Sequence, residues 1–257
     1  MKTMLLLMIA CIAVCTTEAQ TDSLPSTVYH IKQLAVQKDS SRNRIQIMDG
    51  ATPYLTNLEV HITILEPGMS AHPPHTHAAT EELIIVKEGL LKVTIAGKSK
   101  TIGPGGVAMA MAGDEHGAVN TGKEKAVYYL LKYTTGKPPD NESAAKAGGS
   151  VIVDWKDVAV NKTDRGARRQ QYNRSTSLFE KFDMHATTLD KDRDSHLPHT
   201  HREEEIILVK KGTIKMHIGD VFYDAAPGDL VFLNAFVAHA LINTTDGQCE
   251  YFAFQWR

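Results

Sequence analysis

The sequence predicts an all-β protein built from two similar tandem domains, and three features of the chain support this prediction. The segment 58–77 recurs at 182–201 with a constant offset of 124 residues, which falls to 123 further on. Within each repeat, stretches such as "LKVTIAG" and "IKMHIGD" alternate apolar and polar residues, which is the period of a β-strand. Gly or Pro interrupts this pattern about every eight to twelve residues, and long helical patterns are missing. Many short strands between turns are typical of a sandwich or barrel.

The repeat also predicts the domain organisation. We expect a first domain over residues 26–134 and a second over residues 150–257. The linker between them, residues 135–149, is rich in Pro, Gly, Ser and Ala and has no apolar periodicity, which is typical of an exposed connector. The one-residue change of offset falls between His201 and Glu205, so that position should be a loop.

The N-terminus has the pattern of a secretory signal peptide. Residues 1–19 place one lysine before an apolar run and end on small residues at Ala19. The apolar run is shorter than the roughly twenty residues needed to span a bilayer. A lipid anchor at Cys11 or Cys15 is a weaker alternative. We therefore expect cleavage near Ala19 and a secreted or periplasmic protein.

Charge and cysteine content exclude several classes of protein. Lys plus Arg is 28 and Asp plus Glu is 30, and no basic stripe indicates a nucleic acid partner. Beyond the leader, no segment is long and apolar enough to span a membrane. Removal of the leader leaves Cys249 as the sole cysteine. No intrachain disulfide can then form, so the core and any bound metal must supply the stability.

Histidines recur at matched positions of the two repeats. Residues i and i+2 of a strand point to the same side, so His75 and His77 should aim together. A glutamate follows each His-x-His after a short loop, and another histidine comes 34 residues after that glutamate. The two predicted ligand sets are His75, His77, Glu82 and His116, and His199, His201, Glu205 and His239. Three imidazoles and one carboxylate suit Mn, Fe, Ni, Cu or Zn, one ion per domain, with open positions for catalysis.

Each repeat resembles a cupin domain, and the whole chain resembles a bicupin. The first cupin motif is matched by Gly68, the first ligand set up to Glu82, and Gly89; the second motif is matched by Gly105, Gly113, His116 and Asn120, with Met111 replacing a proline. The second repeat supplies Gly212, Gly228 and Asn243 at the structural positions, with Arg193-Asp194 in place of the leading glycine and with Asn234 and Phe236 in place of Pro and Gly. The resemblance implies two small jelly-roll-type β-barrels, each with a metal inside.

Two further histidine pairs are candidates for catalysis or substrate binding. His72 and His196 precede the His-x-His motifs by three residues. Bicupins similar to oxalate decarboxylase have an arginine at this position, so the histidine puts oxalate in doubt as the substrate. His61 and His185 lie on an earlier strand with a polar face, which is either a pocket wall or a solvated outer sheet.

Other residues are interpreted as structural. Glu203 and Glu204 should belong to a solvated loop. The last strand of each repeat should lie in the core or an interface, although some of its residues could reach the cavity: Tyr129, Lys132, Phe252 and Gln255. His30 and His217 have no matching histidine in the other repeat, and we assign them no functional role.

These features predict a metal-dependent enzyme that acts on a small, oxygen-rich molecule. The leading hypothesis is isomerase or lyase chemistry on a sugar or uronate derivative. An iron- or copper-dependent dioxygenase resembling quercetin dioxygenases is an alternative, and decarboxylation or hydrolysis like that of ureidoglycine aminohydrolases stays open. The non-enzymatic alternative is a periplasmic ligand-binding cupin. Bicupins often assemble further, so a homo-oligomer is a further expectation.

Overall fold

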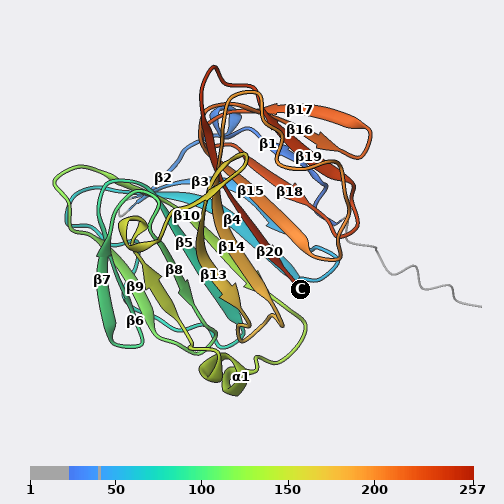
Figure 1. The fold of residues 1–257 in the computed structure, drawn as a ribbon. Helices are drawn as coiled ribbons and strands as arrows, with labels where there is room; N and C mark the ends of the chain where they lie inside the picture. The colour runs from blue at the N-terminus through green and yellow to red at the C-terminus, as the bar shows by residue number, and fades with distance from the viewer. Residues whose placement is uncertain (1–22, 40–41) are drawn as a thin grey trace, which may run out of the picture.

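The computed structural model describes residues 23–39 and 42–257, which form two β domains (Figure 1). The predicted leader, residues 1–19, lies outside the described residues. None of the helices in the described part of the chain is long and apolar enough to cross a membrane. The prediction of an all-β fold is confirmed.

The strands are short and follow the two repeats. The first half contains β1 (Thr27–Tyr29), β2 (Gln37–Lys38), β3 (Asn43–Gly50), β4 (Asn57–Leu65), β5 (Thr80–Glu88), β6 (Leu91–Ile95), β7 (Lys98–Ile102), β8 (Val107–Ala110), β9 (His116–Asn120) and β10 (Ala126–Thr134). The second half contains β11 (Val151–Val153), β12 (Asn161–Thr163), β13 (Gly166–Arg174), β14 (Phe182–Leu189), β15 (Glu204–Lys211), β16 (Ile214–Ile218), β17 (Val221–Ala225), β18 (Leu230–Leu233), β19 (His239–Asn243) and β20 (Cys249–Trp256). The helices are η1 (Ile31–Gln33), α1 (Asn141–Lys146) and η2 (Trp155–Asp157).

Each domain pairs a seven-stranded sheet with a three-stranded sheet. The first domain has the orders β11-β8-β5-β10-β4-β3-β2 and β7-β6-β9, and the second has β1-β18-β15-β20-β14-β13-β12 and β17-β16-β19. All strand pairs within these sheets are antiparallel. Two facing sheets of this kind form a jelly-roll-type sandwich.

The two domains exchange their first strands. β1, from the first repeat, pairs with β18 of the second domain, where Val28 lies opposite Val231. β11, from the second repeat, pairs with β8 of the first domain, where Ile152 lies opposite Ala108. β1 and β11 stand at an offset of 124, the same as that between segments 58–77 and 182–201, so the exchange is symmetric. The spatial domains therefore differ from a simple division of the chain at the linker.

The alternation of side chains along each large sheet separates two cores. On β4, Leu58, Val60 and Ile62 face the other domain and join a core shared by both seven-stranded sheets. The opposite face of each large sheet packs against its own three-stranded sheet, in two separate clusters. Because successive residues of a strand point to opposite faces, a glutamate at one position enters the shared core and its neighbour enters the barrel.

A matched pair of buried glutamates joins the domains across the shared core. Glu81 accepts hydrogen bonds from the backbone N–H of Ser177 at 2.7 Å and from its hydroxyl at 2.6 Å. In the reciprocal contact, Glu204 accepts a hydrogen bond of 2.8 Å from the hydroxyl of Thr52. The prediction that Glu203 and Glu204 lie in a solvated loop is wrong: Glu204 is fully buried, and the side chain of Glu203 is only 13% exposed. The loop predicted between His201 and Glu205 is confirmed, since β15 begins at Glu204.

Candidate metal centres

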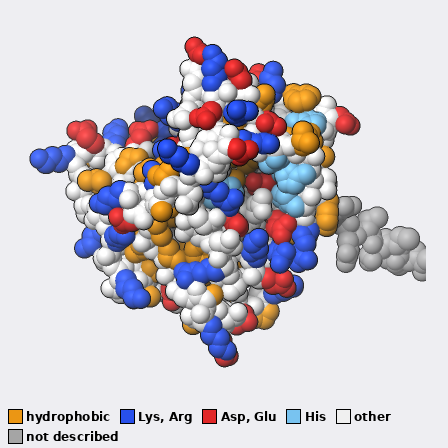
Figure 2. Space-filling view, in the orientation of Figure 1, with side chains coloured by type: hydrophobic (Ala, Val, Ile, Leu, Met, Phe, Trp, Pro, Cys, Tyr) orange, Lys and Arg blue, Asp and Glu red, His pale blue; other side chains and the backbone are white. Residues whose placement is uncertain are grey.

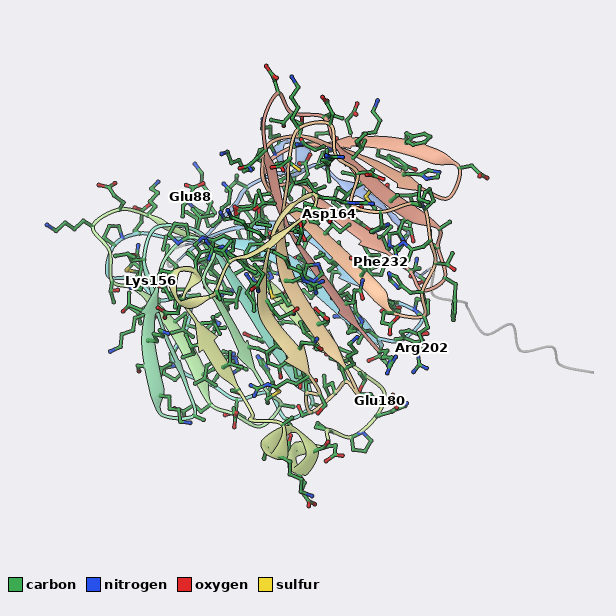
Figure 3. The ribbon with its side chains drawn as sticks, in the orientation of Figure 1. Glu88, Lys156, Asp164, Glu180, Arg202 and Phe232 are labelled. Atoms are coloured by element: carbon green, nitrogen blue, oxygen red, sulfur yellow. The ribbon has the colours of Figure 1, made fainter. Side chains whose placement is uncertain are left out.

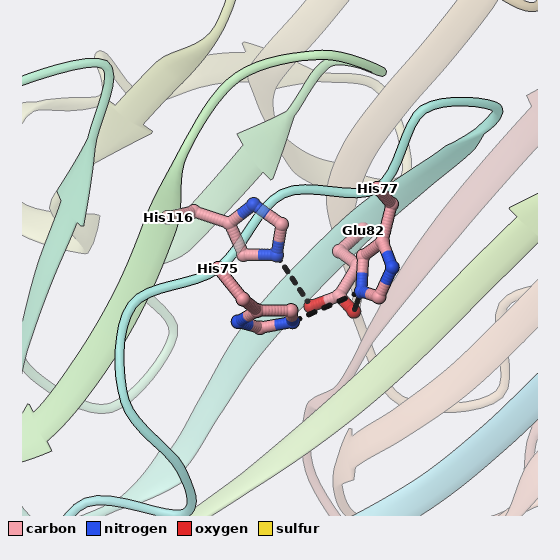
Figure 4. Close-up of side chains that lie close together, drawn as sticks. All are labelled: His75, His77, Glu82 and His116. Carbon is pink, nitrogen blue, oxygen red and sulfur yellow. Dashed lines mark hydrogen bonds and ion pairs between the residues drawn. The ribbon is translucent and has the colours of Figure 1, made fainter.

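The first ligand set converges inside the first domain (Figure 4). Glu82 comes from β5, His116 begins β9, and the loop before β5 supplies His75 and His77. His77 Nε2 lies 2.8 Å from Glu82 Oε1, and His75 Nε2 lies 3.0 Å from His77 Nε2. His116 Nε2 is 3.2 Å from Glu82 Oε2. The loop is held in place because the backbones of His75 and His116 exchange hydrogen bonds of 3.0 and 2.9 Å.

The second ligand set repeats this arrangement with a looser spacing. His201 Nε2 and His239 Nε2 lie 3.2 and 3.1 Å from Glu205 Oε2. In the first centre all four donor atoms lie within 4.8 Å of one another. In the second, two triads overlap at His239: one also contains His201 and Glu205, and the other also contains His196 and His199. His196 therefore joins the ligand cluster, whereas its counterpart His72 is outside the cluster of the first centre.

Both clusters fit a divalent metal. The Nε2 atoms of His116 and His239 are buried and lack a hydrogen-bond partner, although each faces a carboxylate. Their Nδ1 atoms donate to the carbonyl oxygens of Asp114 and Val237 at 2.9 Å, which leaves Nε2 as the basic nitrogen. Buried imidazoles whose second nitrogen is anchored in this way are typical of metal ligands. The mixed nitrogen and oxygen donors suit a transition metal.

The ionisation of the side chains also favours a cation. Burial opposes ionisation of both carboxylates, but contacts with the imidazoles and, at Glu82, the charge of Lys132 outweigh it. The pKa of Glu82 is lowered below its ordinary value, and that of Glu205 is lowered to about 2. Burial, together with the neighbouring histidines, lowers the pKa of His75 and of His199. Burial opposes protonation of His116, but its contact with Glu82 outweighs this and raises the pKa of His116; contact with Glu205 raises the pKa of His201. Because histidine binds metal in its neutral form, a metal would displace the proton that these two imidazoles favour.

The last strand of each domain adds a different side chain beside each centre. Lys132 Nζ lies 3.4 Å from Glu82 Oε1 in the first centre. At the equivalent position of the second, Gln255 Nε2 lies 3.4 Å from His201 Nε2. Of the four residues that could have reached the cavity, Gln255 borders the cavity beside the second centre, and Lys132 contacts the first ligand set. The other two, Tyr129 and Phe252, are buried in the core that the domains share.

The earlier histidine pair lies inside the barrels rather than on a solvated outer sheet. His61 is buried, its Nδ1 is 3.1 Å from Glu59 Oε1, and burial lowers its pKa. His185 is partly exposed, borders a cavity, and has Nδ1 3.3 Å from Asp183 Oδ1. In both domains a carboxylate of the same strand therefore orients the imidazole.

The histidines three residues before the His-x-His motifs stack edge-on against the ligand sets. The ring centroids of His72 and His75 are 4.1 Å apart, as are those of His196 and His199. Each of these outer histidines donates from Nδ1 to the next carbonyl oxygen, as His196 does to Leu197 at 3.0 Å.

The motif glycines and asparagines shape the turns around the centres. Gly89, Gly105, Gly212 and Gly228 all have positive φ angles. A Cβ at Gly89 would lie 2.4 Å from the carbonyl oxygen of Lys125, so only glycine fits that close approach. Asn120 and Asn243 each donate through Nδ2 to backbone carbonyls and accept from a backbone N–H two residues later.

A cavity of about 370 Å³ opens beside the second centre. His196, His199 and Glu205 border it, and the hairpin of β12 and β13 forms another wall. On the face shown in Figure 2, histidine side chains reach the surface over this domain. Among the described residues, the space beside the first centre is about 20 Å³. One reason is that Leu130 fills the position that Ala253 occupies in the second domain.

The chemistry of this cavity includes two residues that the sequence interpretation missed. Arg165 and Arg168 line it, opposite the ligand set. A signal for Arg168 was present, because Arg44 and Gln46 recur as Arg168 and Gln170 at the offset of 124. No such signal existed for Arg165, which has no arginine counterpart in the first repeat.

The family comparison matches both halves of the chain. A model of the cupin domain matches residues 61–132 and again residues 186–254, more than half of the chain in total. The chain is a bicupin. Each match includes one complete predicted ligand set, and the resemblance seen in the motifs is confirmed. No curated protein matches this bicupin in sequence.

Solved structures share the bicupin fold over most of their length. A putative glyoxylate-induced protein from Pseudomonas aeruginosa is 14% identical, with a TM-score of 0.73 over 93% of this chain and 92% of that one. AerE from Microcystis aeruginosa is 14% identical, with a TM-score of 0.68 over 90% of this chain and 98% of that one. Bacillus subtilis oxalate decarboxylase is 13% identical, with a TM-score of 0.66 over 91% of this chain and 78% of that one. At these identities the likeness shows the fold alone.

Proposed function

We propose that this bicupin is a secreted or periplasmic metal-dependent enzyme that acts on a small, oxygen-rich substrate in the second domain. The observation that supports this most directly is the second ligand set, which combines the unpartnered Nε2 of His239 with an adjoining cavity of about 370 Å³. This volume lies within the roughly 300–1,000 Å³ of pockets that bind small molecules. A site that only stabilised the fold would have no need of such a cavity.

The ligand set would be His199, His201, Glu205 and His239, with the first set as a second, more enclosed centre. A divalent metal held there would supply Lewis-acid polarisation of adjacent substrate oxygens. The remaining chemistry falls to side chains of the cavity. The geometry favours isomerisation or elimination on a sugar or uronate derivative, because both reactions need a positioned base.

His185 is the residue best placed to move a proton. It borders the cavity, and its Nδ1 donates to Asp183 Oδ1 at 3.3 Å. That hydrogen bond fixes the ring and makes Nε2 the basic nitrogen, so Nε2 would accept the proton from a substrate carbon next to a carbonyl group. The amide of Gln255 borders the same cavity and would orient a substrate hydroxyl.

The first experiment is elemental analysis of the chain without its predicted leader, residues 20–257. The protein is purified without chelators or a histidine tag, beside a His75→Ala/His199→Ala double variant. We expect about two metal equivalents in the wild type and their loss in the variant. Absence of metal from the wild type, even after reconstitution with Mn, Fe, Ni, Cu or Zn, would refute the enzyme proposal and leave a binding protein.

The identity of the metal then selects the assay. Manganese, nickel or zinc leads to sugar and uronate isomer screens, in which His185→Gln should abolish turnover and keep the metal. Iron or copper with substrate-dependent oxygen uptake would instead support the dioxygenase alternative.

A further inference from the structure

Two arginines form one wall of the cavity beside the second centre. Arg165 lies in the turn between β12 and β13, and Arg168 lies on β13. Both border the same cavity as His199 and Glu205. Their side chains are 36% and 42% exposed, so both are accessible to a ligand that enters the cavity.

Each guanidinium is held in place by one of its terminal nitrogens. Arg165 Nη1 donates to the carbonyl oxygens of Ser195 and Asp194 at 2.8 and 3.2 Å. Arg168 Nη2 donates to Gln170 Oε1 at 3.0 Å and lies 3.7 Å from Asp183 Oδ1. Arg165 Nη1 also lies 3.3 Å from Asp194 Oδ1. Within the described residues, the other terminal nitrogen of each arginine makes no hydrogen bond or ion pair. Each planar group is thus oriented in advance and keeps donors for a ligand.

The free donors of the two arginines are the feature of this cavity that favours an anion. Glu205 faces the imidazoles of its own ligand set, so it does not neutralise the arginine wall. The other acid that borders the cavity is Asp164, labelled in Figure 3; its Oδ2 lies 3.9 Å from Arg165 Nε, and its side chain is 89% exposed at the turn. Two further carboxylates, those of Asp194 and Asp183, lie 3.3 and 3.7 Å from Arg165 and Arg168 without bordering the cavity, so the charges of the arginine wall are paired. The free terminal nitrogen of each guanidinium can still donate to an oxygen of a carboxylate.

The rest of the lining suits hydroxyl groups. The hydroxyls of Thr187 and Ser195 and the amide of Gln255 also border the cavity. We infer that the second cavity binds a hydroxy acid, with its carboxylate on Arg165 and Arg168 and its hydroxyl end toward the metal ligands. The inference deepens the proposed function, and it rests on that function for the metal centre.

The described residues of the first domain do not repeat this arrangement. The counterpart of Arg165 in the first repeat is Ser41. The counterpart of Arg168 is Arg44, which forms an ion pair with Glu59 as Arg168 does with Asp183, but Arg44 does not border the small space beside the first centre. Recognition of the carboxylate is accordingly a property of the second domain, and Arg44 provides a matched control.

The test is isothermal titration of metal-loaded protein with acids and their neutral analogues. The pairs are D-glucuronate with D-glucose, D-galacturonate with D-galactose, and lactate with 1,2-propanediol. We expect at least one acid to bind about tenfold or more tightly than its neutral partner, as charge-assisted hydrogen bonds to two arginines require. Equal binding within every pair, or binding of none of the three acids, would overturn the inference.

Variants locate the effect. Arg168→Gln should weaken binding of the acid about tenfold or more and leave both the affinity for the neutral analogue and the metal content unchanged. Arg168→Lys keeps the charge but loses the planar group, so its affinity for the acid should lie between those of the wild type and Arg168→Gln. Arg44→Gln should change nothing; a loss of acid binding in that variant, with none in Arg168→Gln, would refute the assignment to the second cavity.

Arg168 is the sharper test because Arg165 also ties down the 194–195 loop. Circular dichroism and thermal unfolding of each variant exclude a loss of fold as the cause. A wild type without metal would refute the proposed function, whereas a metal-loaded protein that does not distinguish acid from alcohol refutes only the present inference.

Discussion

Replacing Lys132 by glutamine should strengthen metal binding at the first centre. Lys132 Nζ lies 3.4 Å from Glu82 Oε1, so the ammonium and a metal ion would share one carboxylate. The second domain has Gln255 at the equivalent position, and Lys132→Gln therefore gives the first centre the side chain that the second already has. We expect the wild-type protein to bind its two metals with unequal affinity, more weakly in the first domain.

The size of the effect follows from the charges. Two unit charges about 4 Å apart interact by about 4 kcal/mol at an effective dielectric constant of about 20. The Lys132 side chain is 25% exposed and can turn toward water, so only part of this energy opposes a bound cation. A net effect of about 1–3 kcal/mol corresponds to about a five- to 150-fold difference in Kd.

The assay is calorimetric titration of metal-free protein with the ion found by elemental analysis. The wild type should show two binding events with different Kd values, and Lys132→Gln should make the two Kd values similar. The reciprocal variant, Gln255→Lys, should weaken the second event by a similar factor. If the wild-type sites have equal affinity and neither variant changes them, the lysine does not compete with the metal and the electrostatic reasoning is refuted.

Three further predictions concern stability. Tyr129→Phe removes a buried hydrogen bond of 3.0 Å from its hydroxyl to the carbonyl oxygen of Gly228 across the domains, and should lower the free energy of unfolding by about 1 kcal/mol in urea titrations. Phe236→Gly should raise it by about 0.5 kcal/mol, because Phe236 is 67% exposed and has a φ of +64°, where the first domain has Gly113; an unchanged urea midpoint would argue against backbone strain. The folded-state pKa of Glu205, about 2, lies below the ordinary glutamate value, so its ionisation stabilises the metal-free protein above pH of about 4.3, and this contribution is lost as the pH falls toward 2. Glu205→Gln should flatten that part of the pH–stability curve, and parallel curves for both proteins would contradict the assignment.

The internal repeat of the sequence predicts much of the fold. The period-two alternation is local, and so is the Gly and Pro punctuation, so both indicate strands without knowledge of their partners. The repeat adds the strongest evidence for the ligand sets, because it shows the same histidine and glutamate spacing twice. His75, His77, Glu82 and His116 do lie together in the structure, as their spacing predicted.

What the sequence could not predict is which face of each strand meets which partner. Glu204 and Glu205 are neighbours of the same residue type, yet Glu204 enters the core between the domains and Glu205 faces the metal ligands. The repeat singled out Glu205 as the metal ligand, but no local pattern showed that Glu204 is buried, because its partner Thr52 is 152 residues away along the chain.

The exchange of β1 and β11 and the arginine wall have the same origin. Strand pairing and cavity shape come from contacts between distant segments, and the free energy of those contacts depends on how whole sheets pack. The sequence by itself determined two β domains with two histidine-rich ligand sets. The tertiary structure alone decided that the second set borders a cavity with Arg165 and Arg168, because only packing brings the β12–β13 hairpin against that centre.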